Sequence, residues 1–217
     1  MPTSSGSLPD RLRAARVYLV LEAAAAHVVE PALRGGVDLV QLRDKHASDD
    51  EIVRAGRELR ELCADHGALF LINDRPDLAV ACEADGVHVG QDDMPVGEAR
   101  EIVGPHRVVG TSTHSPEQVD AADASDADYY AVGPVFETPT KEGRPATGWD
   151  LIGYAAGRAT KPWFAIGGMD EVTARAALAA GAERVVVVRA IRDADDPEAA
   201  TRAIRAGLGA ERQVGAA

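Results

Sequence analysis

The residues of this sequence that can do chemistry come directly after short apolar runs. Arg43 and Lys45 follow the run that starts at Leu39, and Lys141 comes shortly after the run "YYAV". An arginine grips an anion as a two-pronged fork, and a lysine acts on it as a compact point charge. Three such cations can gather around a polyanion if the fold brings them together.

Two carboxylates stand at similar places. Asp74 follows the run from Leu69, and Asp93 follows "GVHVG". Side by side they would repel each other and a nearby polyanion unless a cation lay between them. Mg²⁺ suits this role, because it is commonly held by one or two carboxylates and completes its shell with phosphate oxygens and water. Cations, carboxylates and a metal together indicate a diphosphate ligand.

A second anion site is indicated near the end of the chain. The segment "AIGG" (165–168) precedes a helix that is expected to begin at Asp170, and "VVVV" (185–188) ends a further apolar run. Glycines let a phosphate approach exposed backbone N–H groups, and helix N-termini attract negative charge.

Each pattern also has an ordinary structural interpretation. "RDK" (43–45) can be a surface charge cluster, Asn73 a helix cap, "GQDD" (90–93) a helix start, and Gly167 with Gly168 a simple turn. His88 is expected to be a packed core residue, and His114 is compatible with either role. The functional interpretation gains weight only if these residues share one face of the fold.

The elements that would position them alternate between strand and helix. Eight β-rich runs begin at Arg16, Leu39, Leu69, Gly86, Arg107, Tyr129, Pro162 and Arg184. Helical periodicity lies between them, as in "DDEIVRAGRELRELCADHG" from residue 49, where the apolar residues fall near one face.

Near-continuous apolar strands separated by helices predict parallel strands covered by helices. Eight such units in 217 residues predict an α/β fold, a single (β/α)8 TIM barrel, with its site at the carboxyl ends of the strands. A doubly wound open sheet is the alternative, but no "GxGxxG" follows the first strand. We expect one domain over residues 1–217, with a core at about 16–208 and frayed tails.

Composition indicates which partners and which compartment to expect for this protein. A formal net charge of −12 disfavours binding to nucleic acid or to anionic membranes. Cys63 and Cys82 have no metal-type spacing and are expected to be buried free thiols, which fits a reducing compartment. No signal-like segment or membrane-length apolar run occurs, so we expect a cytoplasmic protein. A homo-oligomer is compatible with the sequence.

In combination these motifs resemble the thiamine-phosphate synthase family. The resemblance rests on "QLRDK" (41–45), "IND" (72–74), "GVHVGQDD" (86–93), "GTSTH" (110–114), "VGPVFETPTK" (132–141), "AIGG" (165–168) and "VVVVRAI" (185–191), in that order. It implies a Mg²⁺-dependent transferase that couples hydroxymethylpyrimidine diphosphate to hydroxyethylthiazole phosphate. Diphosphate would leave dissociatively, and the aminopyrimidine ring would stabilise the resulting carbocation.

The resemblance also implies roles for individual residues. The pyrimidine diphosphate would be held by Gln41, Arg43, Lys45 and Asn73, the metal by Asp74 and Asp93, and the leaving group or pyrimidine by Ser112 and Lys141. The thiazole phosphate would meet Thr138, Thr140, Gly168, Val188 and Arg189. Arg189 stands where many relatives have a small residue, and Arg75 is expected to add positive charge beside the metal.

Two other functions stay open. A thiazole tautomerase on a similar barrel could use His114 as its acid and base, but it needs neither a diphosphate clamp nor a metal. A barrel that binds thiamine phosphate without catalysis is the second alternative, and turnover would exclude it.

Overall fold

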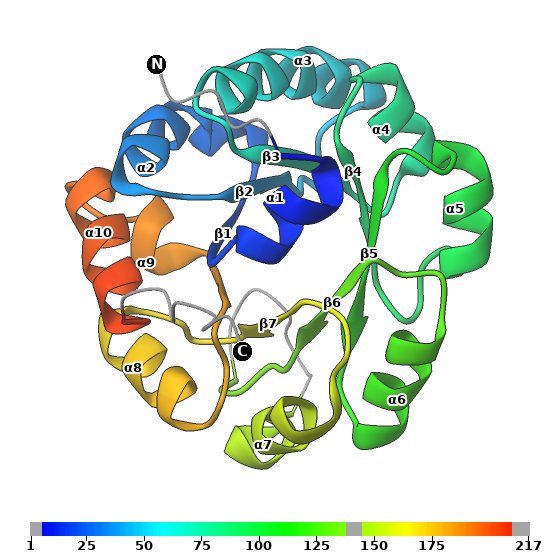
Figure 1. The fold of residues 1–217 in the computed structure, drawn as a ribbon. Coiled ribbons are helices and arrows are strands. Elements are labelled where there is room, and N and C mark those ends of the chain that lie inside the picture. Colours follow the sequence, from blue (N-terminus) through cyan, green and yellow to red (C-terminus); the bar gives the residue numbers. More distant parts are fainter. Residues whose placement is uncertain (1–5, 138–144, 210–217) are drawn as a thin grey trace.

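The structure, a computed structural model, describes residues 6–137 and 145–209. Eight parallel strands close into a barrel in sequence order, and β1 pairs with β8 to complete the ring (Figure 1). The strands are β1 Val17–Leu21, β2 Leu39–Leu42, β3 Leu69–Asn73, β4 Gly86–Val89, β5 Val108–Thr113, β6 Tyr129–Val132, β7 Trp163–Ile166 and β8 Val185–Val187. The (β/α)8 prediction is therefore confirmed, and every predicted run contains a strand.

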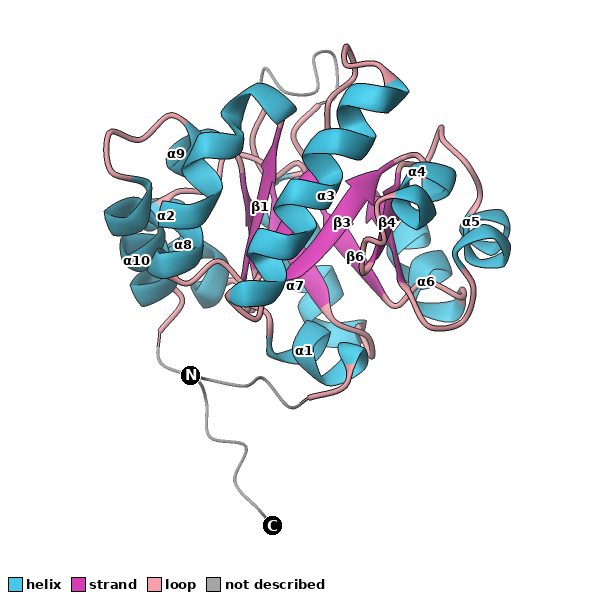
Figure 2. Cartoon of the chain, turned by 90° about the horizontal axis from the view of Figure 1, so that it is seen from above, coloured by secondary structure: helices cyan, strands magenta, loops and turns pink. Residues whose placement is uncertain are grey.

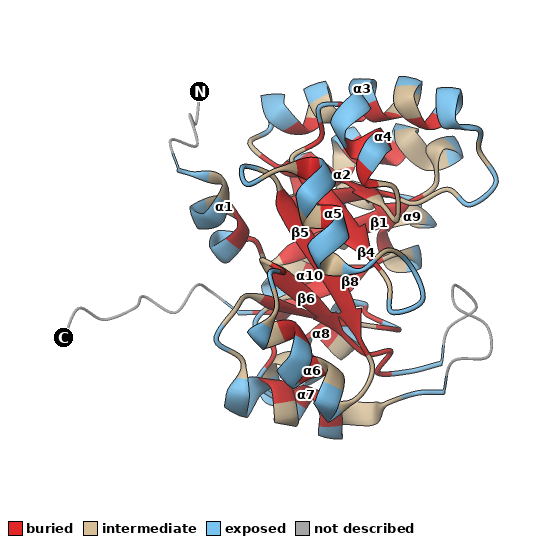
Figure 3. Cartoon of the chain, turned by 90° about the vertical axis from the view of Figure 1, so that its right-hand side faces the viewer, coloured by how far each residue is buried: buried red, intermediate tan, exposed pale blue. Residues whose placement is uncertain are grey.

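Helices surround this ring on the outside (Figure 1). They are the 3-10 helix η1 Ala23–Val28 and the α-helices α2 Val29–Gly35, α3 Asp49–Asp65, α4 Pro76–Ala81, α5 Val96–Val103, α6 Pro116–Ala124, α7 Gly148–Arg158, α8 Glu171–Ala179, α9 Arg189–Arg192 and α10 Pro197–Gly207. In α3 the expected apolar face is turned inward, with Ile52, Leu59 and Cys63 buried. Figure 3 shows the same division throughout, with buried strands inside and helices exposed on their outer faces.

The apolar core has two parts. The larger lies between the outer faces of the strands and the helices. The smaller fills the inside of the barrel, and apart from Leu12 and Ala15 its buried side chains come from alternate positions of the strands. This division follows from the period of two along a strand, which sends successive side chains to opposite faces.

A short helix that the sequence analysis did not anticipate lies across one end of the barrel. This helix, α1 (Leu8–Ala14), covers the end at which the strands begin (Figure 2). Leu12 is buried with the inner core cluster, and the Arg11 guanidinium donates to the backbone oxygens of Gly67 and Ala68. The opposite end, where the strands finish, is thereby left as the place for a site.

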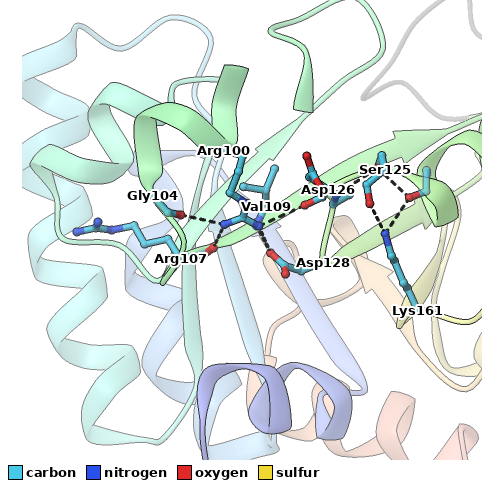
Figure 4. Close-up of polar contacts among 10 residues, drawn as sticks. Arg100, Gly104, Arg107, Val109, Ser125, Asp126, Asp128 and Lys161 are labelled. Carbon is cyan, nitrogen blue, oxygen red and sulfur yellow. Dashed lines mark hydrogen bonds and ion pairs between the residues drawn. The ribbon is translucent and has the colours of Figure 1, made fainter. Parts of the chain in front are cut away.

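Carboxylates tie the strands together where they start. Asp38, Asp85 and Asp128 directly precede β2, β4 and β6, and each accepts a hydrogen bond from a backbone N–H of the preceding strand. Figure 4 shows the most elaborate case, in which Arg100 reaches Asp128 while Asp128 accepts from the Val109 N–H at 2.7 Å.

No helix in the described ranges is long and apolar enough to cross a membrane. The expected frayed tails, residues 1–5 and 210–217, lie outside the described residues.

Candidate functional site

A cavity of about 220 Å³ opens at the carboxyl ends of the strands, and all eight strands contribute to its wall. Ten of the thirteen residues predicted for the site line it: Gln41, Arg43, Lys45, Asn73, Asp74, Asp93, Ser112, Gly168, Val188 and Arg189. The other three, Thr138, Thr140 and Lys141, lie outside the described residues. Side chains up to 148 positions apart, from Gln41 to Arg189, thus meet at one mouth.

The turn after β2 shows how the two cations are presented. Asp44 accepts hydrogen bonds from the backbone N–H groups of Ala23, His46 and Ala47, at 3.0 to 3.2 Å. Partial burial raises the pKa of Asp44, but these three donors outweigh it and lower the pKa overall. Asp44 thus stabilises the turn through its hydrogen bonds, and Arg43 and Lys45 on either side of it line the cavity.

Asp74 sits in an uncommon backbone conformation at the end of β3. Its φ of 60° lies in the left-handed region, and its N–H donates to the His88 carbonyl oxygen at 2.8 Å. Such a conformation in a non-glycine residue costs free energy and persists only where its surroundings hold it. The carboxylate lies 2.9 Å from the Lys45 ammonium, so this cation and carboxylate meet inside the cavity. Asn73 is not the cap of the next helix, because Arg75 occupies that position.

Asp93 is held by a tight turn that requires glycine. Its Oδ2 atom accepts from the Gly90 N–H at 3.0 Å, and a Cβ on Gly90 would come within 2.4 Å of that oxygen. Asp93 does not cap the following helix, since α5 begins after Pro95 without a side-chain cap. The carboxylate is therefore positioned by the turn itself, at the wall of the cavity.

These two carboxylates suit a magnesium ion. Both line the same cavity on adjacent loops, after β3 and after β4. Within residues 6–137 and 145–209, no group of three or more His, Cys, Asp or Glu side chains gathers as a complete protein shell. A donor set of two carboxylates beside cations matches the way Mg²⁺ is shared between protein and phosphate oxygens. The residues present therefore fit the expected metal.

Arg75 does not add its charge to the metal site, which corrects our expectation. Its guanidinium is paired with both oxygens of Asp49 at 2.8 Å and with Asp77 at 2.7 Å. These carboxylates stand at the starts of α3 and α4, outside the cavity wall. Arg75 therefore joins two helix starts, and among the described residues it is Lys45 that forms an ion pair with Asp74.

The opposite wall is made largely of backbone. Gly167 and Gly168 have φ values of 103° and 73°, and a Cβ on Gly167 would lie 2.7 Å from Pro134 Cα. Asp170 caps α8 with its own side chain, accepting from the N–H groups of Val172 and Thr173. An anion on this side would therefore meet the glycine backbone and not the first turn of α8. Arg189 lines the cavity from the start of α9.

Ser112 and the two nearby histidines belong to the cavity as well. Ser112 Oγ lies 3.0 Å from His88 Nε2. His114 is held through its ring Nδ1, which donates to the Gly133 carbonyl oxygen, and through its backbone N–H, which donates to Gln118. Because a carbonyl oxygen can only accept, Nδ1 of His114 carries a proton.

Sequence reasoning missed two residues of the cavity floor, Tyr18 in β1 and His88 in β4. His88 was expected in the core; it is buried, but it also lines the cavity, as Tyr18 does. The sequence feature that could have identified them is a polar side chain in the middle of an apolar strand. From such a position one can infer only that the side chain lies on one of the two faces of the strand. It does not reveal that the inner face forms the floor of a cavity.

The fold and the cavity together define a class. This chain is a parallel (β/α)8 barrel whose open end carries cations, carboxylates and glycine backbone suited to small phosphorylated molecules.

Comparison with known proteins gives the family. The family model described as thiamine monophosphate synthase matches residues 17–191, and the chain belongs to that family. It is 50% identical over 216 residues to the thiamine-phosphate synthase of Mycobacterium bovis, covering 92% of this chain and 97% of that protein. A solved structure, the thiamine phosphate pyrophosphorylase from Pyrococcus furiosus, superposes with a TM-score of 0.84 at 32% identity, covering 93% of this chain and 98% of that one.

Other relatives are longer. The thiamine-phosphate synthase of Nostoc sp. is 48% identical over 193 residues, which cover 88% of this chain. This chain spans only about half of that relative's length, 55%.

Proposed function

We propose that this chain is a transferase that couples hydroxymethylpyrimidine diphosphate to hydroxyethylthiazole phosphate, giving thiamine phosphate and pyrophosphate. The observation that carries the proposal is that Arg43, Lys45, Asp74 and Asp93 converge on one cavity from the loops after three neighbouring strands. The name shared by the relatives supports the same product.

In this reaction the protein needs mainly to bind and stabilise charged groups. The bond between the pyrimidine's methylene carbon and the diphosphate oxygen breaks, and its electron pair leaves with the oxygen. The thiazole nitrogen then supplies the pair for the new carbon–nitrogen bond. No proton has to move, so neither a nucleophilic side chain nor a general base is required.

Arg43 and Lys45 act on the leaving group. Negative charge grows on the diphosphate as it departs, so cations placed there stabilise the transition state more than the bound substrate. We assign Lys141 to the same group of cations, on the resemblance of its motif. Asp74 and Asp93 would hold Mg²⁺, which when bound neutralises diphosphate oxygens.

The remaining predicted residues orient the two substrates. Gln41, Asn73 and Ser112 would hold the pyrimidine side. Gly168, Val188 and Arg189, with Thr138 and Thr140, would hold the thiazole phosphate. Fixing both partners turns a bimolecular attack into an effectively intramolecular one.

The experiment is to mix the purified protein with both phosphorylated substrates and Mg²⁺ and to measure pyrophosphate and thiamine phosphate. Both should appear in equal amounts, and Arg43→Ala should lose most of this activity while keeping its circular dichroism spectrum. A folded protein that releases neither product would refute the proposal. Isomerisation of the thiazole phosphate alone would favour the tautomerase, and binding of thiamine phosphate without turnover would favour the non-catalytic barrel.

The two cysteines bear on the compartment in which the protein works. Cys63 and Cys82 are buried and unpaired with each other, as expected of thiols in a reducing compartment. A cytoplasmic location, a homo-oligomeric state and the lack of nucleic-acid or membrane partners stay predictions from the sequence.

A further inference from the structure

Two ion pairs of opposite polarity join the segment after β2 to the segment after β3. The first, which we name the inner bridge, is the pair of Lys45 and Asp74, and both of its residues line the cavity. The second, the outer bridge, is the pair of Asp49 and Arg75, and both of its residues lie outside the cavity wall. Asp74 and Arg75 are neighbours in the chain, so the end of β3 is held from both sides.

The outer bridge engages most of the Arg75 guanidinium. Its two Nη atoms donate to the two carboxylate oxygens of Asp49, each at 2.8 Å. Its Nε and Nη2 atoms also donate to Asp77, at 2.9 and 2.7 Å. Most exposed ion pairs add little stability, but two-pronged arginine–carboxylate pairs within a network are the exception. The Arg75 side chain is therefore fixed to the starts of both α3 and α4.

The far end of the outer bridge stands on a firm element. Asp49 is the first residue of α3, a helix of 17 residues that begins with a capping box formed by Ser48 and Glu51. Such a box satisfies backbone N–H groups on both sides of the helix start and so holds the first turn in place. Because this turn is held, Asp49 can act as an anchor for Arg75.

Asp74 needs an anchor because its backbone is strained. The Arg75 N–H donates to the Asn73 carbonyl oxygen at 2.8 Å, which closes a three-residue turn around Asp74 and its φ of 60°. Three-residue turns with a positive φ at the centre are rare and strained. The residue that closes this turn is the same residue that the outer bridge holds. The outer bridge therefore opposes the opening of the turn.

The inner bridge cannot hold the turn throughout the proposed reaction. Lys45 is assigned to the diphosphate and Asp74 to Mg²⁺, so their ion pair is exchanged for contacts with these ligands when they bind. The outer bridge lies outside the cavity wall and has no such exchange to make. It therefore still links the two segments when the inner bridge has separated.

We propose that Arg75 and Asp49 are positioning residues that keep the turn at Asp74 closed and so hold the Asp74 carboxylate toward the cavity. The benefit to the metal rests on the proposed function, because it takes Asp74 as a ligand of Mg²⁺. The closed turn itself does not depend on that function, and the two parts are tested separately.

The first test needs neither metal nor substrate. The Asp74 N–H donates to the His88 carbonyl oxygen at 2.8 Å, so its hydrogen exchange, followed by NMR, reports local opening of the turn. Asp49→Ala leaves residues 73–75 unchanged and should speed this exchange about threefold or more. Exchange of the Phe70 N–H, in the same strand and bonded to Asp85, should stay as it is. Equal acceleration at both N–H groups would show a loss of global stability and refute the positioning role.

Asp50→Ala is the matched control. Asp50 carries the same charge in the same first turn of α3, whereas the pairing with Arg75 is made by Asp49. The control variant should therefore leave the exchange of the Asp74 N–H unchanged. If it speeds this exchange as much as Asp49→Ala does, the effect comes from charge at the helix start, and the proposal is wrong.

The second test asks whether the closed turn serves the metal. Arg75→Ala and Asp49→Ala should raise the Mg²⁺ concentration for half-maximal pyrophosphate release about three- to tenfold, at or below the usual effect of a partner bonded directly to a metal ligand. The value of kcat at saturating Mg²⁺ should stay near that of the wild type. The double variant should need no more Mg²⁺ than Arg75→Ala alone, because both substitutions break the same bridge.

The outcomes separate this inference from the proposed function. A Mg²⁺ requirement that is unchanged in both single variants, or effects that multiply in the double variant, would overturn the role toward the metal. If the wild-type protein releases no pyrophosphate, the proposed function fails, while hydrogen exchange still decides whether the outer bridge keeps the turn closed.

Discussion

The two acidic residues of the site are each held by a different backbone device. Asp74 occupies the left-handed region and forms a 2.9 Å ion pair with Lys45, whereas Asp93 folds back onto the Gly90 N–H. Neither device is needed for strand or helix formation. The left-handed backbone of Asp74 is local strain of the kind that is found at functional positions.

At this scale we predict that Asp93→Asn raises the Mg²⁺ concentration for half-maximal activity by about tenfold or more, because a carboxylate is a far better ligand for Mg²⁺ than an amide. Asparagine keeps an oxygen that can accept from Gly90, so the turn should survive. The measurement is a Mg²⁺ titration of pyrophosphate release.

Asp92→Asn serves as the control, since Asp92 is the adjacent carboxylate in the sequence and does not line the cavity. An unchanged Mg²⁺ requirement in Asp93→Asn, or the same rise in both variants, would contradict the assignment of Asp93.

At the scale of elements, the two ends of the strands do different work. The carboxyl ends carry the cavity, whereas the amino ends carry aspartates that bond the neighbouring strand. Asp128 illustrates the second kind: it receives the Val109 N–H of β5 and pairs with Arg100 at 2.5 Å from the last turn of α5. This division agrees with the separation of stability and chemistry in (β/α)8 barrels.

We predict that Asp128→Ala lowers the free energy of unfolding by about 1–3 kcal/mol, because the Val109 N–H loses its acceptor. Asp128→Asn should cost less, about 1 kcal/mol or below, since its amide oxygen can still accept and only a partly exposed ion pair is lost. Urea unfolding measures both values. Equal losses would show that charge and not the backbone hydrogen bond matters, and pyrophosphate release should stay near wild type in both variants.

For the whole molecule, carboxylates that accept several hydrogen bonds determine how the stability of the fold changes at acid pH. Asp123 joins α6 to the segment before β7, accepting from the Thr160 hydroxyl at 2.7 Å, the backbone N–H groups of Thr160 and Lys161, and Tyr130. Burial raises the pKa of Asp123, but these donors outweigh it, so the net pKa is lowered. The same direction holds for Asp44 and Asp77.

A lowered pKa in the folded state means that the stabilisation is fully present above the unfolded value, about 3.9, and is lost as the pH falls through the folded value. We therefore predict that the urea midpoint falls as the pH drops from about 5 to 3. Asp123→Asn should be less stable than the wild type at pH 7, and this difference should shrink at pH 3. A difference that stays constant with pH would contradict the role of the charged carboxylate.

Particular residues show which parts of the fold and of the site can be predicted from the sequence. The eight strands were predictable because an apolar run bounded by turn residues is a local pattern, and ten site residues were predictable because parallel strands put their ends on one rim. Arg75 was misplaced because its partner Asp49 stands 26 positions away, on the start of another helix. Tyr18 and His88 were missed because a floor exists only once the ring of strands has closed.

By itself, then, the sequence determined which segments become strands and helices and which chemical groups follow each strand, since both depend on neighbours along the chain. The tertiary structure decided which groups face one another. Closing the barrel between β1 and β8 brought Gln41 and Ser112 to the wall of one cavity, and the packing of α3 beside α4 paired Arg75 with Asp49 away from that wall. Contacts of that kind depend on side-chain direction across several strands, which no single stretch of sequence contains.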